Sequence, residues 1–501
     1  MAENPGEPAP RGGETPETPR GFGRRHLQVL LLFLAIAMAY GIRINLSVAL
    51  VSMTNEKRHD AYQVYDWAQS TRGTVLSSFF WGYSVMQVPG SMLVQRYGPR
   101  RFLLASIAGC SVLAILTPYA VSLGGVAVLI TIRVAQGLLS GLVFPSSHNM
   151  LGRWTPPLER PRFTSMVYGG MSMGTVAAMA GAGLLCSSQL GWPSAFYVPG
   201  VMGLLWCILW FFLSADTPRQ CKGITPEELA YIERSLGTSA ISSKCVAKVP
   251  WKAILTSPPA LSLLAVHCGQ NFGHWMLLTE MPNFMKTELH FDIKKDGLFS
   301  ALPYISLWLA TFVVGWTAQR VNESGLLSLT ASRKVFNSLA HWGSGLALLL
   351  LALTNPGPYG AVAMLTVAVT LESCIFAGFY VSHMDLSPNF GGALMGLSNG
   401  CGSVMGILAP LVVGVILGEK SEEEIVETWS RVFILTASTY FAGNLVYVLL
   451  CKAEVQPWNE PADKGQHEGK GEEGEDLQGA TLPVDERDAR PKKRWSWLCG
   501  R

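Results

Sequence analysis

Long runs of apolar residues alternate with polar segments along most of this chain. A helix needs about 20 predominantly apolar residues to cross a membrane. Six runs of this kind precede Asp216, at residues 27–51, 74–94, 102–122, 125–149, 164–186 and 194–214. Six more follow Pro258, at residues 259–281, 298–318, 334–354, 359–382, 391–417 and 430–451. The pattern predicts an all-α membrane protein with twelve transmembrane helices in two six-helix halves.

The polar segments divide the chain into five parts. We expect a disordered cytosolic tail, an N-terminal six-helix bundle, a cytosolic central loop, a C-terminal six-helix bundle and a second disordered cytosolic tail, at residues 1–26, 27–214, 215–258, 259–451 and 452–501. Within the central loop, Thr225 followed by Pro226 is typical of a helix start, with threonine as the cap and proline in the first turn.

The distribution of lysine and arginine near the span ends predicts the orientation. The loops after the second, fourth and eighth runs carry Arg96, Arg100, Arg101, Arg153, Arg160, Arg162, Arg320, Arg333 and Lys334, whereas the loops after the third and ninth runs carry no charge. Because positive residues accumulate on the cytosolic side, both termini are expected in the cytosol. The N-terminal tail lacks an acidic dileucine signal, which favours the plasma membrane over a lysosomal or vesicular membrane.

Composition narrows the class of function. Of the 501 residues, 49% are hydrophobic and only 15% are charged, whereas soluble domains average about 25% charged. The net charge of +3 gives no reason to expect a nucleic-acid partner. No phosphate-cradling loop, paired cysteine motif or serine elbow is recognisable. We therefore expect no enzyme activity, no cofactor and no metal, and a monomer whose partners are the lipid bilayer and a small solute.

Two arginines inside apolar runs suggest that the solute is an anion. Arg43 lies deep in the first run, where a guanidinium costs roughly 2.5–3.5 kcal/mol at a helix centre. Arg133, in the fourth run, lies at a comparable depth and could grip the same carboxylate or phosphate with paired donors. The alternative is that Arg133 snorkels outward or pairs with Glu372. Asn45 and Tyr83 are further candidates for binding the substrate.

Several titratable residues in the spans are candidates for ion coupling. Glu372, near the middle of the tenth run, could carry a proton or serve as a fixed counter-ion to an arginine. His148, His267, His274 and His383 lie in or at the ends of runs, and histidine changes charge in the physiological pH range. A lone histidine at a helix end is more often only hydrogen-bonded. The coupling ion could be a proton or sodium.

Strings in both halves resemble the anion:cation symporter family of the major facilitators, which includes sialin, the vesicular glutamate transporters and the sodium/phosphate cotransporters. The first half supplies Arg43-Ile-Asn-Leu-Ser-Val-Ala-Leu, Ser78-Phe-Phe-Trp-Gly-Tyr, Gln87-Val-Pro-Gly, Trp154-Thr-Pro-Pro-Leu-Glu-Arg and Gly191-Trp-Pro-Ser-Ala-Phe-Tyr. The second half supplies Ser300-Ala-Leu-Pro-Tyr, His383-Met-Asp-Leu-Ser-Pro and Met395-Gly-Leu-Ser-Asn-Gly. The resemblance runs from about Gln28 to Trp458, and it looks closest to the sialin-like group labelled inorganic phosphate cotransporters.

The resemblance implies a major facilitator fold and secondary active transport of a small anion, such as phosphate or sialic acid, by alternating access. The driving force would be sodium, protons or membrane potential. By the same resemblance, Arg43 and Arg133 match the arginines of spans one and four that engage the substrate. His148 and His383 match family histidines near the cytosolic ends of spans four and ten. A non-transporting anion receptor and an uncoupled facilitator are alternatives on the same fold.

Residues that depart from the family pattern bear on the substrate and on the ion that drives transport. Sialin-like members carry glutamates where Gln136 and Ser140 stand here, and glutamate transporters carry a histidine and an arginine where Leu76 and Gln270 stand. These differences weaken the expectation that glutamate is the substrate and put proton coupling through span four in doubt. Glu372 could replace the lost carboxylate, or the coupling could use sodium.

Overall fold

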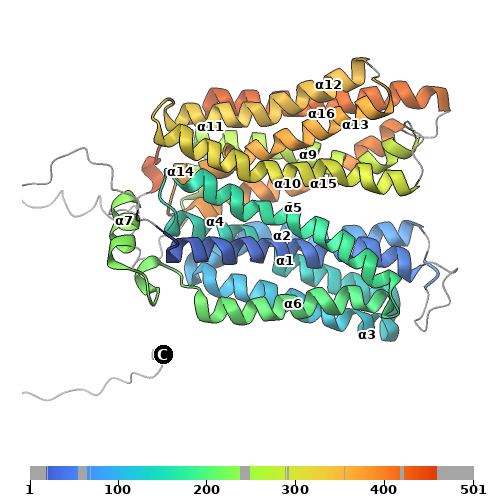
Figure 1. Ribbon diagram of the computed structural model, residues 1–501, viewed down its shortest axis with the longest axis horizontal. Helices are drawn as coiled ribbons and strands as arrows, with labels where there is room; N and C mark the ends of the chain where they lie inside the picture. Colours follow the sequence, from blue (N-terminus) through green and yellow to red (C-terminus); the bar gives the residue numbers. More distant parts are fainter. Residues whose placement is uncertain are drawn as a thin grey trace, which may run out of the picture. The chain divides into compact units, whose positions relative to one another are not determined.

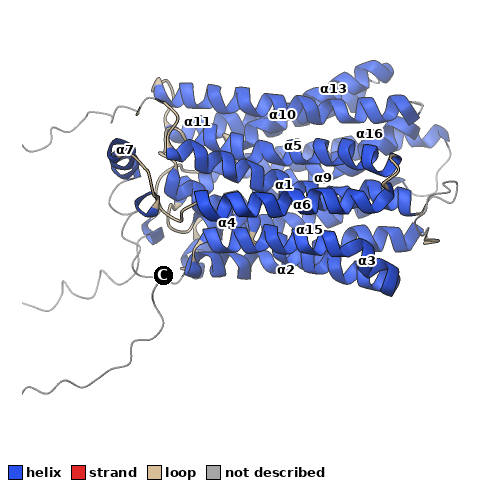
Figure 2. Ribbon diagram, turned by 60° about the horizontal axis from the view of Figure 1, so that its bottom comes forward, coloured by secondary structure: helices blue, strands red, loops and turns tan. Residues whose placement is uncertain are grey.

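The computed structural model describes residues 19, 21–54, 65–67, 69–236, 249–287, 289, 293–354, 356–417 and 422–459. In this part of the chain all regular structure is helical (Figure 2). The described residues belong to one compact unit. The predicted twelve membrane segments in two six-helix halves are present.

The N-terminal half contains six helices. They are α1 (Arg24–Met53), α2 (Gln69–Tyr97), α3 (Pro99–Ser140), α4 (Val143–Trp154), α5 (Arg160–Ser187) and α6 (Gly191–Leu213). The long α3 holds the third segment and the start of the fourth, because the chain turns back at Gly125, whose φ of 59° suits glycine. The fourth segment then continues into α4.

In the C-terminal half, two segments are interrupted. The elements are α9 (Pro258–Thr287), α10 (Ile293–Glu323), α11 (Leu329–Ser338), η3 (Leu339–Gly343), α12 (Ser344–Thr354), α13 (Gly357–Leu371), η4 (Glu372–Phe376), α14 (Phe379–Leu386), α15 (Gly391–Leu417) and α16 (Glu422–Leu450). The ninth segment contains a turn of π-helix, η3, and the tenth a stretch of 3₁₀-helix, η4. Such irregular turns are frequent at functional sites, and η4 begins at Glu372.

The central loop contributes three short helices, η1 (Pro218–Gln220), α7 (Pro226–Leu236) and α8 (Trp251–Thr256). The predicted start of α7 is confirmed, because the Glu228 N–H donates to the Thr225 hydroxyl at 3.3 Å. The Glu228 carboxylate accepts the backbone N–H groups of Arg24 and Arg25 at 2.9 and 3.0 Å, and so caps α1. The helix α7 is thereby fastened to the N-terminal half, at the end of the bundle named here the α7 end (Figure 1).

The two tail boundaries differ from those predicted. Helix α1 already begins at Arg24, and the chain after α16 remains bonded as far as η5 (Pro457–Asn459). The Asn459 side-chain oxygen accepts the Ser387 hydroxyl and the Asn389 N–H at 2.6 and 3.1 Å. Polar and backbone contacts of this kind leave no trace in a pattern of apolar runs. The remaining tail residues, 1–18, 20 and 460–501, lie outside the described part.

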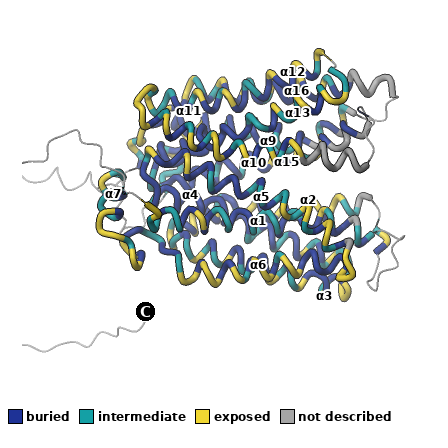
Figure 3. The backbone as a smooth tube through the Cα atoms, viewed as in Figure 1, coloured by how far each residue is buried: buried dark blue, intermediate teal, exposed yellow. Residues whose placement is uncertain are grey.

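Eight helical stretches of the described residues are long and apolar enough to cross a membrane by length and composition alone. They are Arg24–Leu50, Pro99–Trp154, Arg160–Cys186, Gly191–Leu213, Leu329–Thr354, Gly357–Leu386, Gly391–Val413 and Thr428–Leu450. The stretch Pro99–Trp154 contains two segments, and α2, α9 and α10 complete the twelve. Large apolar side chains on outer faces are exposed, as on α6, where Phe212 is 76% exposed (Figure 3). Exposed apolar bands of this kind suit contact with lipid.

The halves pack closely against each other through α2 with α15 and α5 with α10. Glycines allow the close approach: a Cβ on Gly396 would lie 2.7 Å from the Gln87 carbonyl oxygen, and one on Gly392 would lie 2.8 Å from the Pro145 carbonyl oxygen. These contacts leave a cavity between the halves.

Candidate functional site

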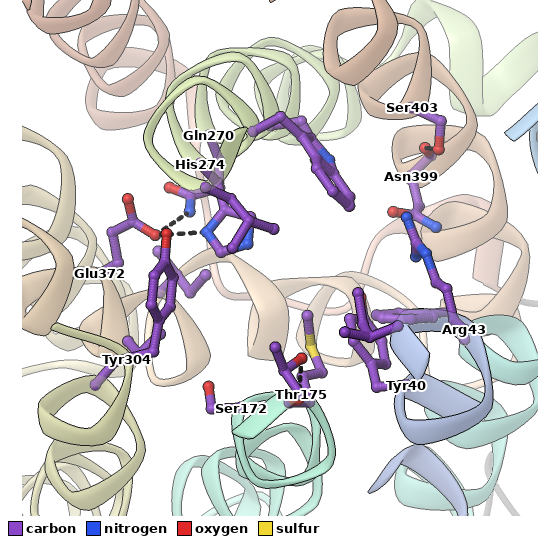
Figure 4. A pocket seen from close by; sticks show the side chains of 18 of the residues that line it. Tyr40, Arg43, Ser172, Thr175, Gln270, His274, Tyr304, Glu372, Asn399 and Ser403 are labelled. Atoms are coloured by element: carbon purple, nitrogen blue, oxygen red, sulfur yellow. Dashed lines mark hydrogen bonds and ion pairs between the residues drawn. The ribbon is translucent and has the colours of Figure 1, made fainter. Parts of the chain in front are cut away.

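A cavity lies between the halves, and both contribute to its wall. The N-terminal half lines it with Tyr40, Arg43, Ile44, Phe80, Tyr83, Phe144, Met171, Ser172 and Thr175. The C-terminal half lines it with Gln270, Asn271, His274, Trp275, Leu278, Tyr304, Leu307, Glu372, Ile375, Phe376, Tyr380, Asn399 and Ser403. Most of this wall is aromatic or aliphatic. Its two oppositely charged groups, Arg43 and Glu372, lie on opposite sides (Figure 4).

Arg43 enters the cavity from α1 through a cage of aromatic rings. Its guanidinium carbon lies 4.6–5.5 Å from the ring centres of Tyr40, Phe79, Phe80, Tyr83 and Trp275. Cation–π attraction to these rings offsets part of the desolvation cost of the charge. One guanidinium nitrogen, Nη2, is buried without a hydrogen-bond partner. Buried donors of this kind are met by water or by an ion, and at the wall of this cavity a bound anion can be the acceptor.

Arg133 lies behind Arg43 rather than in the cavity wall. Its Nη1 donates to the Gln136 side-chain oxygen at 3.0 Å, and its Nη2 donates to the Arg43 carbonyl oxygen at 3.1 Å. Its guanidinium carbon lies 4.9 Å from the Phe79 ring centre, a ring that Arg43 also contacts. The predicted alternative of an ion pair with Glu372 is not found in the described residues. Arg133 therefore holds the backbone of Arg43 and adds a second positive charge behind it.

The other two candidates for binding the substrate have different positions. Tyr83 lines the cavity, and its hydroxyl accepts the Asn399 side-chain amide at 2.8 Å, a bond that joins α2 to α15. Asn45 does not line the cavity; its amide donates to the Ala195 carbonyl oxygen at 2.8 Å and joins α1 to α6.

Glu372 forms the opposite pole of the cavity from the start of η4. One carboxylate oxygen, Oε2, lies 2.9 Å from His274 Nδ1 and accepts the Gln270 amide at 3.3 Å (Figure 4). The other, Oε1, accepts the Tyr440 hydroxyl at 2.6 Å. The carboxylate is 3% exposed and the imidazole of His274 is 25% exposed. Glu372 is therefore bonded within its own half, and it lines the cavity next to the more exposed His274.

His148, His267 and His383, the three histidines proposed for coupling, form a cluster outside the cavity wall. The ring centres of His148 and His267 lie 5.4 and 6.1 Å from that of His383, and the Ser398 hydroxyl bonds to both His267 and His383 at 3.0 and 2.8 Å. His148 bonds to the Tyr168 hydroxyl and donates to the Tyr380 carbonyl oxygen at 3.2 Å. Each of these bonds can be made by a neutral imidazole, which suits a packing role.

At the α7 end an ion-pair network closes the contact between the halves. Asp385 on α14 accepts Arg333 of its own half at 2.8 Å and Arg160 of the other half at 3.0 Å. All three side chains are at least 96% buried. The sequence pattern counted Arg160 and Arg333 only as charges flanking the spans.

Sequence reasoning named Gln270 and His274 separately, but it missed that they share the face of α9 that contributes most to the C-terminal wall. Gln270, Asn271, His274, Trp275 and Leu278 all line the cavity, and their spacing places them on one side of a helix. That periodicity could have identified the face. The contact of His274 with Glu372 could not be foreseen, because 98 residues separate them.

Two six-helix halves around a cavity lined from both sides define a secondary transporter that works by alternating access. The model of the Major Facilitator Superfamily matches residues 32–410. The chain therefore belongs to the Major Facilitator Superfamily, and within it to the anion:cation symporter family.

Relatives with similar sequences include the "Putative inorganic phosphate cotransporter" of Drosophila melanogaster, which is 36% identical over 89% of this chain and 88% of the relative. Vesicular glutamate transporter 2 of Homo sapiens is 32% identical over 89% of this chain and 77% of the relative. Among solved structures, the E. coli fucose:proton symporter has a TM-score of 0.62 at 11% identity, over 86% of this chain and all of that one. The proton:xylose symporter has a TM-score of 0.62 at 15% identity, over 85% and 97%. At identities this low, the two structures show only that the fold is shared.

Proposed function

We propose that this transporter carries a small organic anion, bound by its carboxylate at Arg43. The observation that carries the proposal is the buried Nη2 of Arg43, which lacks a hydrogen-bond partner at the wall of a cavity lined by both halves. A guanidinium fits a carboxylate with two parallel donors. Arg133 supports the same assignment, because its bond to the Arg43 carbonyl and its charge both favour an anion at this place.

The walls favour an organic anion over inorganic phosphate. Apolar area removed from water contributes roughly 25 cal/mol per Å², and the rings around Arg43 offer such area to the body of an organic acid. Inorganic phosphate has no apolar part that could gain from contact with this area. Phosphate is the second candidate, because the relative from Drosophila melanogaster, 36% identical, is named as an inorganic phosphate cotransporter.

For the placement in the cell we propose a multi-pass protein of the plasma membrane, with both termini cytosolic and the monomer as the working form. The support for the orientation is the gathering of Arg96, Arg100, Arg153 and Arg320 near helix ends on the α7 side. A lysosomal or vesicular membrane is the alternative location.

Uptake into proteoliposomes tests the proposal. Purified protein would be assayed with radiolabelled sialic acid, L-glutamate and inorganic phosphate in parallel, as wild type, Arg43→Gln and Arg43→Lys. Truncating one partner of a buried charge pair costs about 2–5 kcal/mol, so Arg43→Gln should lower uptake at least about thirtyfold. Arg219→Gln, at an exposed arginine outside the cavity, is the control.

Three results would contradict the proposal. Normal uptake by Arg43→Gln would exclude Arg43 as the anion site. Uptake of phosphate alone would replace the organic anion by the second candidate. Anion binding that depends on Arg43, without uptake under any gradient, would indicate a receptor on the same fold.

A further inference from the structure

We infer that Glu372 and His274 together form the proton-binding site that couples transport, so that one proton accompanies each anion. The inference rests on the proposed function, because the proton is assigned to drive the anion held at Arg43. It goes beyond that function in naming the coupling ion and the pair of residues that takes it.

The position of the pair suits exchange of a proton with the cavity. The Glu372 carboxylate is nearly enclosed at 3% exposure, whereas the His274 imidazole is 25% exposed and lines the cavity. The two groups are 2.9 Å apart, within reach of direct proton transfer. A proton from cavity water can therefore reach the carboxylate through the imidazole.

Glu372 also lies at the break in the tenth membrane segment. Helix α13 ends at Leu371 and the 3₁₀ stretch η4 begins at Glu372. Broken helices near the middle of the membrane place substrate and ion sites in many secondary transporters. Ionisable residues within the membrane are costly, and they mark proton relays and ion pathways.

Besides His274, several groups on the packed elements face Glu372. Tyr440 of α16 donates to it at 2.6 Å. Tyr304 of α10, Tyr380 of α14 and His341 of η3 interact with it electrostatically. His341 Nδ1 donates to the Asn337 carbonyl oxygen at 3.0 Å, and His341 is 1% exposed.

The charges of the cavity explain why the proton and the anion would travel together. Neutral His274 with ionised Glu372 carries one negative charge, which opposes an anion entering beside Arg43. Adding one proton, which comes to rest on the Glu372 carboxylate, makes the pair neutral and removes this repulsion. By linkage, an anion at Arg43 favours the proton on the pair to the same degree. The transporter with both proton and anion bound, or with neither, is therefore favoured over the transporter with only one of them. This is the condition for symport.

Infrared difference spectroscopy of the full-length protein tests the site without any substrate. Stepping the pH between about 8 and 4 should reveal the C=O stretch of a carboxyl group that becomes protonated. Glu372→Gln should remove this band, Glu372→Asp should move it, and Glu280→Gln should leave it unchanged. A wild-type spectrum identical to that of Glu372→Gln would overturn the inference.

Transport under imposed gradients tests the coupling. In wild type, external acid should drive uptake of sialic acid or L-glutamate, and one pH unit should support up to about tenfold accumulation for one proton per anion. Because a proton and a monovalent anion carry no net charge, membrane potential should have little effect. Glu372→Gln should lose the acid-driven accumulation and carry one negative charge per turnover, so an inside-positive potential should now increase uptake.

The variants separate failure of this inference from failure of the proposed function. Acid-driven, voltage-independent uptake retained by Glu372→Gln, or uptake driven by a sodium gradient alone, would overturn the inference and leave the anion site in place. Normal uptake by Arg43→Gln would overturn the proposed function, while the infrared spectra would still decide whether Glu372 takes a proton. A merely structural role for Glu372 would lower the uptake rate without creating the voltage dependence.

Discussion

Replacing Asp385 by asparagine should open the contact between the halves at the α7 end. The carboxylate of Asp385 holds Arg160 of the other half at 3.0 Å and Arg333 of its own half at 2.8 Å. Asparagine keeps the shape and can still accept a hydrogen bond, but it removes the negative charge shared by two buried guanidiniums. The substitution therefore tests the electrostatic part of the closure.

The expected magnitude follows from which of the two ion pairs changes when the halves separate. Breaking a buried ion pair by removing one partner costs about 3–5 kcal/mol. The pair with Arg333 lies within the C-terminal half, so we expect it to persist whether the α7 end is closed or open. Its loss should therefore destabilise the closed and the open conformation equally. The pair with Arg160 exists only when the α7 end is closed. About 3 kcal/mol should therefore be lost by the closed state alone, a shift of more than about a hundredfold in the equilibrium.

Spin-label distance measurements would detect this shift. Labels at Leu158 and Leu326 occupy exposed positions on the two halves at the α7 end, 37% and 78% exposed. Asp385→Asn and Arg160→Gln should both move the distance distribution to longer values. Arg333→Gln is the matched control: it should lower the thermal stability of the C-terminal half without a comparable shift in distance.

The reasoning would be refuted by a folded Asp385→Asn protein whose distance distribution matches that of wild type. It would also be refuted if Arg333→Gln opened the α7 end as far as Arg160→Gln does. Either result would mean that apolar packing and close helix contacts, rather than the shared carboxylate, hold this end closed.

Three further changes have outcomes that the structure determines. Arg133→Gln should raise KM for the anion about tenfold with a smaller change in kcat, since it removes a bond to the Arg43 carbonyl and a nearby charge, and uptake kinetics would show it. Gly137→Ala should lower the melting temperature, because its Cβ would lie 2.0 Å from the Phe79 carbonyl oxygen, an overpacking worth about 1–3 kcal/mol. Gly183→Ala, whose Cβ would meet nothing within 4 Å, should leave the melting temperature unchanged. Glu228→Gln should destabilise the N-terminal half by about 1–3 kcal/mol in a thermal melt, since a charged cap of two N–H groups is weakened.

The membrane segments could be predicted because a helix in lipid requires a long run of predominantly apolar residues. The runs found in the sequence all correspond to helical segments, including the third and fourth, which the structure joins across Gly125. The break at η4 could not be predicted, because residues on both sides of Glu372 are as apolar as a continuous helix would need. The bonded residues 452–459 were missed for the opposite reason, since they are held by polar contacts.

Residues of the candidate site could be predicted where a charged side chain interrupts an apolar run. Arg43 and Glu372 stand out as charges in apolar runs, and both line the cavity. The role of Arg133 depends on a bond to the Arg43 backbone, 90 residues away in the chain, and no local pattern encodes such a contact. The same holds for Asp385 and its two arginines, because pairing between helices is fixed only when the halves assemble.

The cap that Glu228 places on α1 has a consequence for the order of synthesis. The acceptor follows the donors Arg24 and Arg25 by 204 and 203 residues. At about 5–20 residues per second, the ribosome needs roughly 10–40 s to reach Glu228 after making the start of α1. The first helix must therefore enter the membrane before the N–H groups of Arg24 and Arg25 have this acceptor. They gain it only once all six helices of their half have been made.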